Sequence, residues 1–190
     1  MRAADGDSSG APERRPRGAR KRSWQAREVA SMPGPDWRDD TGVVALPGGA
    51  RVRGRRLTDS VSPADFALVL ARGPLPPWSH RRIRWPDFWI PIDRCDALDA
   101  LREAHRRAYA GERVEITCRG GTGRTGTALA ALAILDGMPA GEAIHWVRTA
   151  YRPRAVETPW QRRWLRGLDA DAERRCQGGH QRLPRSGSRG

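Results

Sequence analysis

The chain has 190 residues and a formal net charge of +13, from 35 basic and 22 acidic side chains. This length allows one domain with a sizeable hydrophobic core, and the basic excess favours acidic partners, including phosphorylated ones. No run approaches the ~18 apolar residues that a membrane span needs, so the sequence predicts none. The three cysteines are widely spaced and include no C-x-x-C pair, so neither a disulfide framework nor a zinc site is expected.

Composition divides the chain into a middle part and two tails. Residues 1–35 are rich in Arg, Gly, Pro, Ser and Ala and have little to bury, so we expect a disordered basic tail. Residues 171–190 are expected to form a second one. Their charge permits weak contact with nucleic acid, but a solvated tail is the preferred interpretation, because only Trp24 is interleaved with the N-terminal arginines for base stacking. Residues 36–170 are predicted to form a single domain.

The first half of this domain predicts short strands. Residues 42–57 are expected to form two strands around a Pro47-Gly48-Gly49 turn. Residues 65–70 are apolar enough for a buried strand, and another strand is expected at about residues 81–85. Asp93 is placed to cap a helix that runs to about Ala110.

The second half predicts one more strand and three helices. Residues 114–117 are a β-branched run bounded by glycine, and the stretch from Arg124 to Asp136 carries Ala and Leu on every face, as a buried helix does. Pro139 is expected to begin the next helix. These elements predict an α/β fold with a central, mainly parallel sheet flanked by helices, whose ligand site lies at the carboxyl ends of the strands.

A capping-box pattern, T-P-x-Q, begins the last predicted helix. Thr158 and Gln161 occupy its two capping positions, and the helix is expected to continue to about Leu168. Trp160, Trp164, Leu165 and Leu168 are expected to pack inward.

Between the 114–117 strand and the buried helix lies Cys118, followed by a glycine-rich turn. Glycine gives this turn the backbone freedom to bring its N–H groups together into an anion-binding nest, which the positive end of the helix dipole reinforces. Arg124 adds a planar fork that can grip two oxygens of a bound oxyanion. The same nest should favour the thiolate form of Cys118, which is the nucleophilic form, and Thr125 could add a hydroxyl donor to the sulfur.

These residues carry a resemblance to a known family. The segment CRGGTGRT, residues 118–125, matches the C-x5-R-[ST] loop of cysteine-dependent phosphatases, and the chain resembles the protein tyrosine phosphatase superfamily over roughly Val43 to Leu168. A second segment, WPDFWIP at residues 85–91, resembles the WPD loop of that family, whose aspartate is the general acid. A weaker match, Glu157-Thr158-x-x-Gln161, resembles the family's Q-loop. Thr117 stands where the family usually has histidine, and Glu157 where it has glutamine.

The resemblance implies hydrolysis of phosphate monoesters through a cysteinyl-phosphate intermediate, with no cofactor and no metal. A phosphotyrosine-bearing protein is the preferred substrate, with dual-specificity or small phosphoester substrates as the open alternative. Because a catalytic thiol requires a reducing compartment, a cytoplasmic location is expected. The site residues implied are Cys118, Arg124, Asp87 and Thr125 for catalysis, Arg119, Gly120, Gly121, Thr122, Gly123 and Arg124 for phosphate binding, and Glu157 and Gln161 for positioning the hydrolytic water.

Other functions fit the pattern less well. Gly121-x-Gly123-x-x-Gly126 is also a literal G-x-G-x-x-G, but a dinucleotide-binding fold needs a second strand ending in an acidic residue about 20 positions on, where this chain predicts a helix. A nucleoside triphosphatase would need a lysine after the glycine loop, and a sulfurtransferase would leave the Asp87 segment unexplained. A catalytically inactive phosphate-binding module and a basic nucleic-acid-binding protein remain as non-enzyme alternatives.

Overall fold

A five-stranded sheet forms the centre of the computed structural model, which describes residues 41–168. The strand order is β1-β2-β5-β3-β4; β1 is antiparallel to β2, and all other neighbours are parallel. The predicted mainly parallel sheet is therefore confirmed, whereas both predicted tails lie outside the described residues. The strands are β1 Val43–Ala45, β2 Arg51–Arg56, β3 Phe66–Val69, β4 His80–Arg82 and β5 Val114–Cys118.

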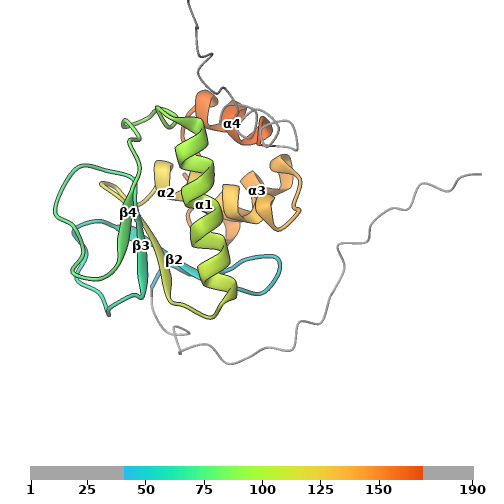
Figure 1. Ribbon diagram of the computed structural model, residues 1–190. Helices are drawn as coiled ribbons and strands as arrows, with labels where there is room; N and C mark the ends of the chain where they lie inside the picture. Colours follow the sequence, from blue (N-terminus) through green and yellow to red (C-terminus); the bar gives the residue numbers. More distant parts are fainter. Residues whose placement is uncertain (1–40, 169–190) are drawn as a thin grey trace, which may run out of the picture.

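The helices gather on one side of the sheet (Figure 1). Two of them begin at the predicted caps: Asp93 accepts hydrogen bonds from the N–H groups of Cys95 and Asp96, and Thr158 and Gln161 close a complete capping box. The sequence signals at both helix starts are thus confirmed. The helices are α1 Arg94–Tyr109, α2 Gly123–Leu135, α3 Ala140–Ala150 and α4 Pro159–Arg166.

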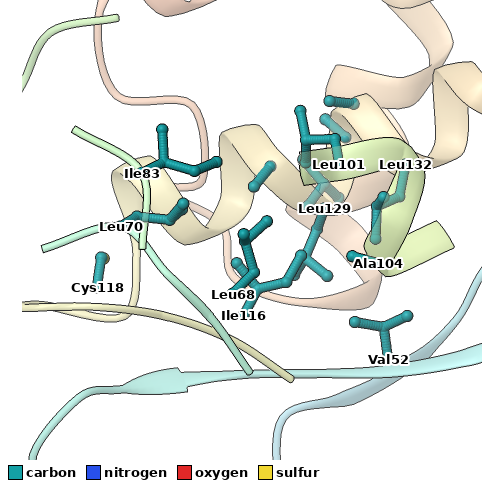
Figure 2. Close-up of a cluster of buried hydrophobic side chains, with 14 of the residues drawn as sticks. Val52, Leu68, Leu70, Ile83, Leu101, Ala104, Ile116, Cys118, Leu129 and Leu132 are labelled. Atoms are coloured by element: carbon teal, nitrogen blue, oxygen red, sulfur yellow. The ribbon is translucent and has the colours of Figure 1, made fainter. Parts of the chain in front are cut away.

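Helix α2 is the central helix of the domain. Every residue from Gly123 to Ala133 is buried, because α2 contacts β2 and β5 of the sheet and all three other helices. Its many small alanine side chains allow these elements to approach closely. Figure 2 shows side chains of the sheet, α1 and α2 interleaved in the core, with Cys118 at one edge of the cluster. The end of β5 therefore places the predicted nucleophile where the core meets the surface.

A buried ion cluster fixes β2 beside β5. Glu115 accepts hydrogen bonds from Arg53 at 2.8 Å and from Arg55 at 2.7 and 2.8 Å, and Trp78 donates to the same carboxylate at 3.2 Å. Because both guanidinium groups are buried, losing the Glu115 carboxylate would leave two buried positive charges uncompensated, at a cost of about 3–5 kcal/mol. The cluster holds the register that sets Arg56 opposite Cys118.

Two expectations differ from the structure. The strand expected at 81–85 is His80–Arg82, because the next backbone carbonyls bond outside the sheet: Arg84 O accepts from Ile92 N–H, and Trp85 O from Arg124. Trp160 was expected to pack inward but is 51% exposed, since its first-turn position turns the ring toward Trp89, with centroids 5.4 Å apart.

Residues 41–168 lack two features that would indicate other classes of protein. None of the helices there combines the length and hydropathy needed to cross a membrane. The same residues contain no group of three or more His, Cys, Asp or Glu side chains arranged to hold a metal ion.

Candidate active site

The cysteine loop joins the end of β5 to the start of α2. Cys118 is 2% exposed, and its sulfur accepts a hydrogen bond from the Gly121 N–H at 3.2 Å. Gly121 has φ +61°, and a Cβ there would lie 2.6 Å from the backbone nitrogen of Arg56. Only glycine fits this left-handed, crowded position, so the turn that aims an N–H group at the sulfur depends on it.

Arg124 lies in the first turn of α2 and is 6% exposed. One of its terminal nitrogens donates to the carbonyls of Leu70 and Trp85, both at 3.0 Å. The other pairs with Asp87 Oδ1 at 2.9 Å. These contacts leave the guanidinium little freedom, and they attach the end of β3 and the WPD-like segment to the cysteine loop.

Asp87 reaches the cysteine loop through that ion pair. Its side chain is 55% exposed, so the carboxylate lies between the buried guanidinium and solvent. This is a suitable place for a group that exchanges protons with water and with a bound substrate. The structure thus brings together Cys118, Arg124 and Asp87, which the sequence had named from two separate segments.

The WPD-like segment is held by its own aromatic side chains. The Trp85 indole donates to Trp89 O at 2.8 Å and packs edge-on against Trp164 of α4, with ring centroids 5.1 Å apart. Phe88 has φ +54°, a left-handed conformation that is uncommon for a bulky residue, and it is exposed. The backbone therefore turns sharply directly after Asp87.

Glu157 lies against the end of the cysteine loop, and Gln161 bonds the WPD-like segment. A Cβ on Gly123 would lie 1.8 Å from Glu157 Oε2, so this carboxylate rests against the first residue of α2. Gln161 is fully buried; besides closing the capping box, its amide donates to Trp89 O at 3.5 Å. The two candidate water-positioning residues therefore contact the start of α2 and the WPD-like segment, respectively.

The remaining predicted residues line the loop unequally. Arg119 and Gly120 are exposed, and Thr122 is partly buried, with its hydroxyl donating to Gly120 O at 3.2 Å. Thr125 is fully buried, and within residues 41–168 its hydroxyl has no hydrogen-bond partner, so the expected bond to sulfur is not formed. The hydroxyl of Thr117, in the family's histidine position, is likewise buried without a partner there.

Two side chains that the sequence analysis did not assign to the site also reach the loop. Tyr151 and Arg152, at the end of α3, donate hydrogen bonds to the loop's outer face. Burial raises the pKa of the Tyr151 phenol above its ordinary value, so it remains a neutral donor. In the sequence, these residues are marked only by their position at the end of a predicted helix, and that position alone does not indicate a role in a site.

The chain is similar to solved structures of phosphatases. No protein-family model and no curated protein matches the chain. Among solved structures, a mutant form of Tk-PTP is 29% identical, with 58% of this chain and 79% of that chain covered and a TM-score of 0.51. The active form of Tk-PTP is 33% identical over 55% and 78%, with a TM-score of 0.46. DUSP15 shares the fold at 16% identity, over 65% and 81%, with a TM-score of 0.51.

Proposed function

Because the chain belongs to the protein tyrosine phosphatase superfamily, we propose that it hydrolyses phosphate monoesters through a cysteinyl-phosphate intermediate. Phosphotyrosine in proteins is the preferred substrate, and dual-specificity or small-molecule phosphate esters are the alternative within the same chemistry. The observation that carries the proposal is the 2.9 Å ion pair between Arg124 and Asp87 at the cysteine loop. It brings an anion-binding group and a carboxyl group able to exchange protons together at the loop that holds a buried thiol.

In the first step, the Cys118 thiolate attacks phosphorus in line with the ester oxygen. The S–P bond forms as the P–O bond to the leaving group breaks, and protonated Asp87 gives its proton to the departing oxygen. Arg124 and the loop N–H groups bind the equatorial oxygens, where negative charge is held in the transition state. The contacts of Arg124 with Leu70 and Trp85 support this role, because they fix the guanidinium before substrate arrives.

In the second step, Asp87 is a carboxylate and removes a proton from a water molecule. That water attacks phosphorus, the S–P bond breaks, and inorganic phosphate and the thiolate are released. Glu157 and Gln161 are the candidates for positioning this water, because one lies against the start of α2 and the other bonds the WPD-like segment. Neither step as written requires a metal.

The test is to trap the intermediate. We expect acid quenching during turnover of a ³²P-labelled phosphotyrosine peptide, in the presence of chelator, to leave label on Cys118, identified by peptide mapping. Cys118→Ser should carry no label and should lose activity by about 10⁴-fold or more. Parallel assays with phosphoserine peptides and small phosphoesters would separate the substrate classes. Turnover that survives in Cys118→Ser would refute the mechanism, and phosphate binding without turnover in the native protein would favour the inactive binding module.

A further inference from the structure

The end of α3 carries two side chains that contact the outer face of the cysteine loop. Tyr151 donates from its hydroxyl to Gly121 O at 2.5 Å. Arg152 donates from one terminal nitrogen to Thr122 Oγ1 at 3.1 Å and to Gly120 O at 3.4 Å. The C-cap residue of α3 and the residue after it thus bond three consecutive residues of the loop.

The planarity of the peptide group relays these contacts to the sulfur. In a trans peptide, the carbonyl and the following N–H point in opposite directions. Gly120 O and Gly121 N–H belong to one such group: Arg152 and Thr122 bond the oxygen, and the N–H donates to Cys118 Sγ at 3.2 Å. In the next peptide group, Tyr151 donates to Gly121 O. Because this group is also planar and trans, the Thr122 N–H points away from Tyr151. Holding the carbonyls outward therefore holds the N–H groups inward.

The position of the tyrosine is built into the sheet. Gly54 lies in the middle of β2, and a Cβ there would approach two ring carbons of Tyr151 to 2.7 Å. The Tyr151 ring occupies the space that a side chain at position 54 would fill. The Arg152 guanidinium lies over the same ring, 5.3 Å from its centroid, so the two side chains support each other.

We propose that Tyr151 and Arg152 are positioning residues for the cysteine loop: by holding Gly120 O and Gly121 O outward, they keep the N–H groups directed at the Cys118 thiolate and at a bound phosphate. The inference rests on the proposed function for its catalytic meaning, but the loop geometry it describes is measurable without turnover. Arg152 contributes a positive charge as well as hydrogen bonds, so its loss has the larger effect.

The test uses the rate at which iodoacetamide alkylates Cys118, followed against pH by peptide mass spectrometry in the full chain. Tyr151→Phe keeps the ring and removes one donor. Its alkylation profile should move to higher pH, with the rate near pH 6.5 reduced about 3- to 10-fold, the worth of one hydrogen bond. Arg152→Gln should shift the profile further, and Arg152→Lys, which retains the charge, should recover part of the shift.

The chain offers matched controls. Tyr109, the other of its two tyrosines, donates to Asp136 instead, and Arg154 is exposed two residues beyond Arg152. Tyr109→Phe and Arg154→Gln should leave the profile unchanged.

The experiment distinguishes failure of the positioning role from failure of the proposed function. If Tyr151→Phe and Arg152→Gln lower the melting temperature but leave the alkylation profile superimposed on that of the native protein, the positioning role is wrong and the contacts are only structural. If the profile shifts while the native protein hydrolyses none of the phosphoesters, the positioning inference stands and the proposed function fails. In an active protein, we also expect kcat to fall more than KM changes, because the N–H groups serve mainly the transition state.

Discussion

Helix α2 has buried or partly buried polar side chains at both ends, and the two ends differ in whether these side chains have hydrogen-bond partners. At the C-terminal end, the Asp136 carboxylate accepts hydrogen bonds from Gly48 N–H at 2.9 Å, from the Tyr109 hydroxyl at 2.7 Å and from His105. At the N-terminal end, the Tyr151 hydroxyl donates to Gly121 O of the cysteine loop. There, however, Arg124 Nε and Thr125 Oγ1 are buried without a hydrogen-bond partner within residues 41–168.

The difference lies in whether the polar groups at each end have partners within the fold, as a structural cluster does and as the proposed active site does not. The Asp136 carboxylate is satisfied by three donors from two parts of the chain, helix α1 and the turn between β1 and β2. Around Arg124, buried donors remain unused, at a cost to stability that a folded protein tolerates when a bound group satisfies them. Changes at the N-terminal end should therefore act on catalysis, and changes at the C-terminal end on stability.

The largest effect is expected at Asp87. Asp87→Asn cannot donate the proton, so phosphotyrosine or alkyl-phosphate turnover should fall by about 100- to 10,000-fold. Nitrophenyl phosphate, whose leaving group needs the proton less, should be affected far less. Steady-state kinetics on both substrates measure the difference. Equal slowing of all leaving groups would mean that Asp87 is structural, and Glu157 would be the next acid to examine.

Arg124→Lys is the next largest change. Lysine keeps the charge but cannot make two parallel bonds to phosphate oxygens or hold both Leu70 O and Trp85 O, so kcat/KM should fall by about 100- to 1,000-fold. Inorganic phosphate affinity, measured as product inhibition, should weaken in parallel. Near-native kinetics would show that phosphate is bound by other groups.

At the opposite end of α2, Asp136→Ala should affect stability alone. Three donors lose their acceptor, and because Tyr109 and Gly48 can turn to water, the cost should be about 1–2 kcal/mol. Thermal denaturation measures the loss, and kcat/KM below the melting temperature should equal that of the native protein. A loss of activity in the folded variant would contradict the separation of the two ends.

The smallest effect is a pH dependence of the same cluster. Burial raises the pKa of the Asp136 carboxyl, but bonds from His105, Gly48 N–H and Tyr109 outweigh it and hold the pKa below its ordinary value of 3.8. A lowered pKa in the folded state means that the stabilisation is fully present above 3.8 and disappears as the pH falls through the folded-state pKa. The stability advantage of the native protein over Asp136→Asn should therefore shrink as the pH falls below 3.8. An advantage that is constant with pH would refute this assignment.

The sequence predicted the parts of the site that are local in the chain. Cys118 and Arg124 are separated by one turn, so a strand, a glycine run and a helix start were enough to place them together. Tyr151 and Arg152 were missed because they meet the loop only when the end of α3 packs against β2. The one local sign of that packing is Gly54, a glycine in the middle of a strand, which commonly marks a close approach.

Surface positions were the least predictable. Trp160 follows the helix-starting Pro159, where the apolar pattern alone does not distinguish a ring packed on the core from one packed on a neighbouring loop.

The length of strand β4 was also not predictable from the sequence. It depends on the carbonyls of Arg84 and Trp85, which bond Ile92 across a turn and Arg124 far along the chain. Periodicity contains no information about such partners.

The ion pair between Asp87 and Arg124 also has a consequence for selectivity. A carboxylate tethered 2.9 Å from the guanidinium is an internal competitor whose effective concentration no dissolved anion readily matches. A weakly binding monoanion gains too little from the arginine to displace it. Under the proposed function, a phosphate dianion gains more, because it would bond the guanidinium and the loop N–H groups at once. Its arrival would free Asp87, so the same exchange that admits the anion would also release the carboxyl group proposed as the acid.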